Sequence, residues 1–358
     1  MHRSEIPAGL LETLRKGTAI PAIPLALDAD RRFDPRRQRA LVRYYIDAGA
    51  GGIAAGVHTT QFEIRDPRHG LFRPVLTEVS AAIDGWCARR GRPVLKVGGV
   101  CGPTAQALEE AEFLVSEGYH AGLLSLAGHG EDSDEELLAH VRKTAEVIPV
   151  IGFYLQPAVG GRILSYEFWR GLCEIENVIA IKMAPFNRYR TFDVVRAVAE
   201  SGRADEIALY TGNDDNIVVD LLTEYAIRTS RGIRRLRIVG GLLGHWSVWT
   251  RRAAELLREA RDLSEAGAPI PQALLTLAQE VTDANAAVFD AAHNFEGCIP
   301  GIHEVLRRQG FLAGIWCLNP EEDLSPGQAE EIDRVCRSYP HLTDDEFVAA
   351  HLPEWLSD

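Results

Sequence analysis

The chain has few lysines and lacks paired cysteines and long apolar runs. Only four lysines, Lys16, Lys96, Lys143 and Lys182, occur among 358 residues, and the other basic residues are arginines. None of the six cysteines forms a C-x-x-C pair, which argues against a cysteine metal site and favours reduced thiols. No apolar run approaches a membrane span, and no secretory signal begins the chain. We therefore expect a cytoplasmic protein that does not enter a membrane.

Positive charge is also in short supply. The net charge is −13, which argues against general nucleic-acid binding and against attachment to anionic membrane surfaces. The arginine-rich segments Arg31–Arg39 and Arg228–Arg237 are interpreted as solvated faces. The apolar fraction of 46% and charged fraction of 25% are typical of a soluble globular protein. We therefore expect neither a nucleic acid nor a membrane as a partner.

Apolar strand patterns alternate with amphipathic helix patterns along most of the chain. The expected strands are Ala19–Leu27, Gly52–Val57, Pro93–Val100, Ala121–Leu126, Val150–Leu155, Val178–Ala184, Glu206–Thr211 and Arg237–Leu243. The helices expected after them are Pro35–Ala48, Val75–Arg90, Thr104–Glu117, Asp134–Glu146, Ser165–Cys173, Phe192–Glu200, Asn216–Arg228 and Val248–Ala266. Eight such units predict a (β/α)8 barrel, an α/β fold, and the first strand lacks a dinucleotide-binding glycine motif.

The last quarter of the chain predicts a helical extension of this barrel. Helical patterns occupy Gln272–His293, Gly301–Gln309 and Gly327–Arg337, and no low-complexity linker precedes them. We therefore predict a barrel with a lead-in helix over residues 1–268 and an extension packed on it over residues 269–358.

Lys182 stands in the apolar stretch Val178–Ala184, which is predicted to be a buried strand. Burying an ammonium group is costly, so the group finds a partner or loses its proton. A deprotonated lysine amine is a nucleophile for carbonyl carbon and forms Schiff bases. The alternative is a lysine at a strand end that reaches solvent or pairs with a carboxylate.

Active sites of (β/α)8 barrels lie at the carboxyl ends of the strands, and several polar residues stand there. Besides Lys182, the strand ends carry Tyr154, the hydroxyl pair Thr59 and Thr60 with His58, and the loop glycines Gly161 and Gly241. Each has an ordinary structural interpretation as a core aromatic, a cap or a turn residue. Together they predict a Schiff-base site, in which Tyr154 moves protons and hydroxyl and loop N–H groups hold a carboxylate.

These residues resemble the dihydrodipicolinate synthase / N-acetylneuraminate lyase family of class I aldolases. Gly52–Phe62 is similar to the family's Gly-x-x-Gly-Thr-Thr-Gly-Glu-Phe segment, and Tyr154–Pro157 to its Tyr-Asn-x-Pro. Ala180–Met183 is similar to its Gly-x-Lys-(Asp/Glu) strand, and Thr211–Asp214 to its Ser-Gly-Asp-Asp turn. The spacing of 28 residues between Tyr154 and Lys182 is also the one that the family shows.

The resemblance implies a lyase or aldolase that acts on pyruvate or another 2-oxo acid through a Lys182 imine, without a further cofactor. It also implies Tyr154 as proton relay, Thr59 as a carboxylate contact and a homo-oligomer, commonly a tetramer or dimer. His58, Thr60, Gly161 and Gly241 are the substrate-binding residues that we predict.

One departure from the family pattern concerns the second substrate. Members that make dihydrodipicolinate place an arginine two residues after the proline of Tyr-Asn-x-Pro, and Val159 stands there. We therefore predict a different, less anionic second substrate, unless Arg162 takes over the role. Two alternatives stay open, a sugar-acid dehydratase that uses the same lysine and a non-catalytic barrel that binds a metabolite. A metal-dependent aldolase is disfavoured, because His58, His129 and His245 have no paired spacing.

Overall fold

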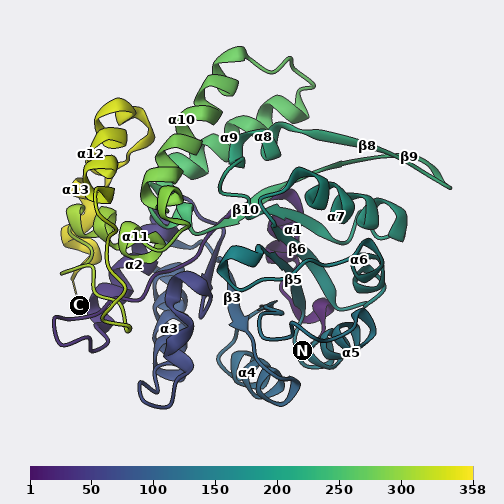
Figure 1. Ribbon diagram of the computed structural model, residues 1–358, viewed down its shortest axis with the longest axis horizontal. Coiled ribbons are helices and arrows are strands. Elements are labelled where there is room, and N and C mark those ends of the chain that lie inside the picture. The colour runs from purple at the N-terminus through teal and green to yellow at the C-terminus, as the bar shows by residue number, and fades with distance from the viewer. Residues whose placement is uncertain (358) are drawn as a thin grey trace. The chain divides into compact units, whose positions relative to one another are not determined.

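The computed structural model describes residues 1–357 of the chain, which folds as a (β/α)8 barrel. Eight strands form one sheet, in the order β1-β10-β7-β6-β5-β4-β3-β2 (Figure 1). Their bounds are β1 Ala19–Pro21, β2 Gly52–Ala55, β3 Leu95–Val100, β4 Ala121–Leu124, β5 Val150–Leu155, β6 Val178–Ala184, β7 Ala208–Thr211 and β10 Gly240–Leu243. A parallel bridge between Ala22 and Ala54 joins β1 to β2, the two end strands of this order. The predicted fold class is confirmed.

Helices follow the strands as the alternating pattern predicts. Those of the barrel units are α2 Pro35–Ala48, α3 Phe72–Arg90, α4 Thr104–Ser116, α5 Asp134–Val147, α6 Tyr166–Cys173, α7 Arg188–Ser201, α8 Ile217–Leu222 and α9 Thr250–Glu265. Others are α1 Ala8–Lys16 before the barrel, and α10 Gln272–Val288, α11 Cys298–Arg308, α12 Gln328–Ser338 and α13 Asp345–Trp355 after it. The C-terminal helices are thus present, and α13 lies beyond the last of the three helical patterns named above. The boundary near residue 268 stays a prediction.

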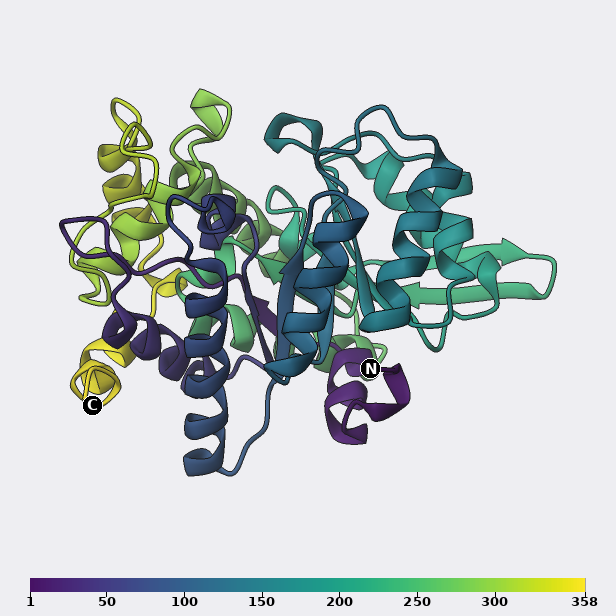
Figure 2. The same cartoon turned by 90° about the horizontal axis from the view of Figure 1, so that it is seen from below.

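The chain divides into two compact units, which are described separately. One unit consists of Met1–Thr18 and Leu95–Leu242, and the other of Ala19–Val94 and Leu243–Asp358. The first unit contains β3 to β7 with α4 to α8, and its helices lie beside these strands (Figure 2). The neighbouring strands from β3 to β7 pair in parallel, and β5 and β6 pair over their whole lengths apart from one bulge between Val150 and Ile151.

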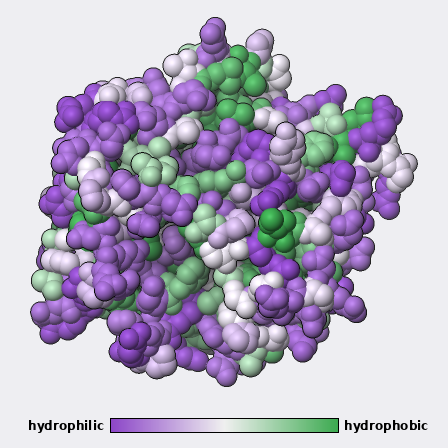
Figure 3. All heavy atoms as spheres, viewed as in Figure 1, coloured by the Kyte–Doolittle hydropathy of each residue, from purple (hydrophilic) through white to green (hydrophobic). Residues whose placement is uncertain are grey.

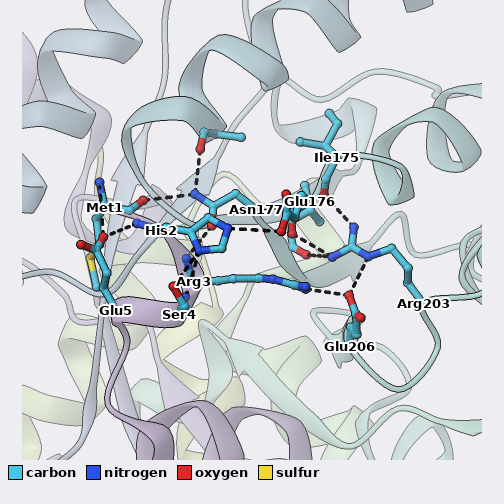
Figure 4. A network of polar contacts seen from close by, with 12 residues as sticks. Met1, His2, Arg3, Ser4, Glu5, Ile175, Glu176, Asn177, Arg203 and Glu206 are labelled. Carbon is cyan, nitrogen blue, oxygen red and sulfur yellow. Dashed lines mark hydrogen bonds and ion pairs between the residues drawn. The ribbon is translucent and has the colours of Figure 1, made fainter.

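The N-terminal segment is held at the start of β6 and β7 within the first unit (Figure 4). The Arg3 guanidinium lies 2.6 Å from a carboxylate oxygen of Glu206, which also accepts from Arg203 at 2.8 Å. The backbone N–H of Arg3 donates to the Asn177 side chain at 2.7 Å. The two arginines lower the pKa of Glu206 to about 2, since both donate hydrogen bonds to its carboxylate. This network anchors the lead-in segment before α1.

In the second unit, α13 packs through aromatic rings and a buried carboxylate. Trp355 stacks on Phe311 with ring centroids 5.8 Å apart, and its indole N–H donates to Asp47 at 2.9 Å. Asp344 accepts the Tyr44 hydroxyl at 2.6 Å and the Gln309 amide at 3.0 Å. These hydrogen bonds satisfy the buried Asp344 carboxylate and tie the start of the C-terminal helix to the unit's core.

The segment between β7 and β10 differs from the predicted helix Asn216–Arg228. Helix α8 ends at Leu222, and a β-hairpin follows, formed by β8 Glu224–Thr229 and β9 Gly232–Arg237. This prediction is wrong in its second half. Tyr225 and Ile227 of β8 are paired with Leu236 and Arg234 of β9, so these side chains share one face of the hairpin. That face packs toward α7, because the Tyr225 ring lies 6.3 Å from the ring of Phe192. The arginines of Arg228–Arg237 accordingly lie on this hairpin.

Candidate active site

Lys182 projects from the face of β6 that points away from the helices. Its Cα partners are Phe153 on β5 and Tyr210 on β7, so these three side chains share one face of the sheet. The opposite face of β5 is covered by α6, because a Cβ atom at Gly152 would lie 3.3 Å from Leu172. Lys182 therefore points into the barrel interior, and its Nζ lies 4.3 Å from the centroid of the Phe153 ring.

The surroundings of Lys182 favour a neutral amine. Burial lowers the pKa of Lys182 to about 8, and the negative charge of Asp214 opposes this shift. Within residues 1–357, no carboxylate forms an ion pair with Nζ. The amine therefore loses its proton at a lower pH than an ordinary lysine, which is almost entirely charged at pH 8.

A glycine leaves room for the Lys182 side chain. A Cβ atom on Gly212 would lie 2.6 Å from Lys182 Cε and 2.9 Å from Ala184 Cβ, which is closer than side chains tolerate. The Gly212 N–H donates to the Met183 carbonyl at 2.7 Å, which holds the turn against β6. Gly212 lies in the Thr211–Asp214 turn quoted above, but its role in admitting the lysine cannot be read from that motif.

Asp220 organises this turn from the first part of α8. Its buried carboxylate accepts hydrogen bonds from Thr211 Oγ1 at 2.7 Å, Asn213 Nδ2 at 2.9 Å and Asn216 Nδ2 at 2.9 Å. The Arg188 guanidinium donates to the same carboxylate at 2.6 Å. The network fixes the segment that carries Gly212 and Asp214. The sequence signal for it is one aspartate inside the apolar stretch Ile217–Leu222.

Tyr154 lies on the other face of β5. Its Cα partner is Met183, its ring centroid is 5.1 Å from that of Trp169 on α6, and its side chain is fully buried. The hydroxyl accepts from Leu164 N at 3.3 Å and donates to Leu164 O at 3.4 Å. Burial raises the pKa of Tyr154. The described contacts thus bring Phe153, rather than the Tyr154 hydroxyl, to Lys182, and the relay role of Tyr154 stays a prediction.

The Tyr154→Phe variant distinguishes a structural role of the Tyr154 hydroxyl from a role as proton relay. Because the hydroxyl is bonded to Leu164, we expect the variant to keep imine trapping at Lys182 and to lose about 1 kcal/mol of stability from the missing hydrogen bonds. Trapping is followed by mass spectrometry and stability by urea unfolding. A fall in kcat of about 10²–10⁴-fold without loss of stability would instead establish Tyr154 as the proton relay.

Gly161 and Arg162 shape the loop after β5. A Cβ atom on Gly161 would lie 2.0 Å from the Leu155 carbonyl oxygen, so this position requires glycine. Arg162 Nη1 donates to the Asp132 carbonyl at 2.9 Å and also to the His129 carbonyl. The guanidinium is thus engaged with the loop between β4 and α5. Gly241, the other predicted glycine of this unit, lies buried in β10, and its N–H donates to Thr18 O at 3.3 Å.

The remaining predicted site residues belong to the second unit, in a short 3-10 turn over His58–Thr60. Thr60 Oγ1 accepts from Gly56 N at 3.0 Å and donates to Ile23 O at 2.7 Å, so it connects two backbone segments. Thr59 is buried, and the His58 ring lies 6.0 Å from that of Phe62. The roles of His58, Thr59 and Thr60 toward a substrate stay predictions.

Two features are absent from the part of the chain that the structure describes. Within residues 1–357, no group of three or more His, Cys, Asp or Glu side chains is placed to hold a metal ion. The same part of the chain contains no helix with the length and hydropathy needed to span a bilayer. The face seen in Figure 3 is mostly hydrophilic, with apolar residues scattered over it.

Comparison with known proteins gives relatives of one enzyme family. No protein-family model matches the chain. A 4-hydroxy-tetrahydrodipicolinate synthase of Synechocystis is 26% identical over 211 residues, which are 58% of this chain and 65% of that protein. The curated relatives and solved structures that are similar to this chain are dihydrodipicolinate synthases and N-acetylneuraminate lyases. The resemblance to the dihydrodipicolinate synthase / N-acetylneuraminate lyase family is thereby confirmed. The alignment spans less than two thirds of this curated relative, so the activity of this chain is a matter for proposal.

Solved structures of the family show the same fold. Dihydrodipicolinate synthase from Acinetobacter baumannii, complexed with pyruvate, has a TM-score of 0.73 at 20% identity over 90% of this chain and 99% of its own. N-acetylneuraminate lyase from Fusobacterium nucleatum has a TM-score of 0.68 at 16% identity over 91% of this chain and 99% of its own. At such identities the likeness concerns the fold alone.

Proposed function

We propose that the chain is a Schiff-base lyase or aldolase that acts on pyruvate or another 2-oxo acid through Lys182. The observation that carries the proposal is a lysine on the interior face of β6, without an ion-pair partner in residues 1–357, whose pKa is lowered to about 8 by burial. Such an amine is nucleophilic near neutral pH, which an exposed lysine is not. The relatives support the class of reaction, since they carry the names of synthases and lyases of one family.

The chemistry follows from the amine. The Lys182 nitrogen lone pair attacks the ketone carbon, the carbonyl π electrons move to oxygen, and proton transfers give a carbinolamine. Loss of water forms a protonated imine, which withdraws electrons from the adjacent carbon more strongly than the ketone does. Loss of a proton from that carbon gives an enamine, whose electrons form a carbon–carbon bond to an aldehyde. Water then hydrolyses the imine and returns the free lysine, and cleavage runs the same steps in reverse.

The described side chains around Lys182 have distinct parts in this scheme. The negative charge of Asp214 acts on Lys182 and stabilises the cationic imine. The Phe153 ring, 4.3 Å from Nζ, excludes water on one side and presents its π face to the cation. Gly212 leaves the space in which the side chain lies. The scheme requires no metal or organic cofactor, because the lysine itself supplies the electron sink.

The substrate proposal rests partly on a neighbour. The Acinetobacter baumannii synthase of the same fold is complexed with pyruvate, and we propose a 2-oxo acid of that kind for this chain. We also propose a cytoplasmic homo-oligomer, a tetramer or dimer, on the family resemblance. Sedimentation of the purified protein tests the oligomeric state.

Imine formation should depend on pH in a characteristic way. Only the unprotonated amine attacks, so the rate of borohydride trapping with pyruvate is expected to rise with pH and level off above about 8, the pKa of Lys182. A single-turnover trapping series between pH 6 and pH 10.5, at about 0.15 M salt, measures this profile. A rate that still rises up to pH 10.5 would show an ordinary, exposed lysine and would contradict the proposed environment.

The second substrate is expected to be less anionic than aspartate semialdehyde. Val159 stands where the resembling synthases place an arginine, and Arg162 is engaged with the His129 and Asp132 carbonyls. A carboxylate buried without a partner costs several kcal/mol, so we expect uncharged aldehydes to react with pyruvate at least about tenfold faster. Both aldehydes are assayed at equal concentration by pyruvate consumption. A clear preference for the semialdehyde would mean that another arginine binds its carboxylate.

A further inference from the structure

The hairpin of β8 and β9 helps to form a second concave site in the first unit, away from Lys182. A cavity of about 380 Å³ is lined by β9 from Ile233 to Arg237 and by the start of β7, and Arg15 of α1 also lines it. In Figure 1 the hairpin reaches out beyond α7. The volume lies within the range of small-molecule sites. A (β/α)8 barrel needs no hairpin between its seventh helix and eighth strand, so this insertion is free to serve another purpose.

The lining is strongly basic although the chain is acidic. Four arginines, Arg15, Arg234, Arg235 and Arg237, line the cavity together with one carboxylate, Asp205. Glu224 pairs with Arg235, and its other oxygen lies 3.5 Å from Arg237.

Two of these arginines are left for a ligand. Among residues 1–357, neither Arg15 nor Arg234 has an ion-pair partner, and the two come from different elements, α1 and β9. In a chain of net charge −13, this is a local concentration of uncompensated positive charge. Guanidinium groups bind phosphate and carboxylate with two parallel hydrogen bonds, so the lining is suited to an anion.

The floor of the cavity is apolar. Ile207, Leu209, Leu236 and Val239 line it, and all but Val239 are buried. Bare inorganic anions gain nothing from such a floor, whereas a ligand with an apolar body buries surface there. We propose that this cavity binds a small organic anion with an aromatic or aliphatic body and a phosphate or carboxylate group held by Arg15 and Arg234.

The site is distinct from the Lys182 site. It takes in Ala208 at the beginning of β7, whereas Gly212 follows the end of that strand and packs on Lys182. Parallel strands of a barrel start at the face opposite the active site. Binding in the cavity therefore does not require imine formation, and Lys182→Ala is expected to leave it unchanged.

The test is isothermal titration calorimetry of the full chain with 1-naphthyl phosphate at about 0.15 M salt, which screens diffuse electrostatics. We expect saturable binding, one ligand per chain, that is at least about tenfold tighter than binding of inorganic phosphate. The double variant Arg15→Gln/Arg234→Gln should bind at least about tenfold more weakly. The control Arg228→Gln/Arg231→Gln removes equal charge from the same hairpin outside the cavity and should bind within about twofold of wild type.

Four results would overturn the proposal. Absence of saturable binding would show that the cavity is not a site for such an anion. Equal losses in both double variants would show that the arginines act only as a diffuse charge. Equal affinity for 1-naphthyl phosphate and inorganic phosphate would show that the apolar floor contributes nothing to binding. A change of oligomeric state in Arg15→Gln/Arg234→Gln, seen by sedimentation with ligand affinity unchanged, would assign the cavity to an interface between copies. Unchanged circular dichroism of the variants serves as the folding check.

Discussion

Replacing Lys182 with alanine is expected to abolish the borohydride-dependent adduct with pyruvate and to lower turnover by more than about 10⁴-fold, as removal of a nucleophile does elsewhere. The expected loss is large because no other described residue supplies the electron sink. The side chain lies against the Phe153 ring and beside Gly212, and the Asp214 charge acts on it without a direct ion pair, so its removal breaks no ion pair. The variant should therefore fold, as judged by its thermal unfolding.

Two other lysines make this experiment discriminating. Lys143 lies exposed on α5, and Lys143→Ala should keep both the adduct and the turnover. Lys96 is buried in β3 and is the lysine that could replace Lys182 in an alternative account. If Lys182→Ala still forms an adduct and the label lies on Lys96, the assignment of the nucleophile is wrong.

Replacing Asp220 with alanine is expected to lower the free energy of unfolding by about 3 kcal/mol and kcat by at least about 10²-fold. The carboxylate is buried and accepts from Thr211, Asn213 and Asn216 as well as Arg188. Its loss leaves these donors without their acceptor and frees the turn that carries Gly212 and Asp214. The proposed imine depends on that turn for its position, so we expect activity to fall further than stability alone explains.

Two measurements distinguish a positioning role of Asp220 from a contribution to stability alone. Urea unfolding gives the stability, and trapping at saturating pyruvate under folding conditions gives the activity of the folded fraction. Asp220→Asn keeps the shape and one acceptor oxygen, so both effects should be smaller. If Asp220→Ala is destabilised but its folded fraction traps pyruvate at the rate of wild type, Asp220 has no positioning role.

The barrel could be predicted because its signals are local. Each buried strand is a short apolar stretch with turn residues at both ends, and each helix repeats its apolar residues with the helical period. The stretch Val178–Ala184 was recognisable for the same reason, and β6 has these bounds in the structure. The anomaly of one lysine in it pointed to the site before any neighbouring residue was known.

The hairpin could not be predicted from the same signals. Leu221, Leu222 and Tyr225 continue the helical spacing of Ile217 and Val218, which favours one long helix. The structure ends α8 at Leu222 and reverses the chain at Ser230 and Arg231, and β9 then begins at Gly232, whose φ of +104° suits glycine. The local sequence is compatible with either a helix or a strand here. The pairing of β8 with β9 and the packing of the hairpin on α7 favour the strand.

The orientation of the Tyr154 side chain could not be predicted from sequence spacing either. A distance of 28 residues places Tyr154 and Lys182 on adjacent strands but does not fix their register. A shift of one residue turns a side chain to the other face, and the observed pairing sets Phe153 opposite Lys182. The Asp220 network was missed for a related reason, since its donors meet only after the turn and α8 have formed.

The most direct test of the central claim is peptide mass mapping after borohydride reduction of the wild-type protein with a panel of 2-oxo acids. The protein is digested, and the modified lysine is located by fragmentation. We predict one adduct per chain with pyruvate or a close 2-oxo acid, on the peptide that contains Lys182. The absence of any adduct across the panel at pH 8, or an adduct on a different lysine, would contradict the proposed function.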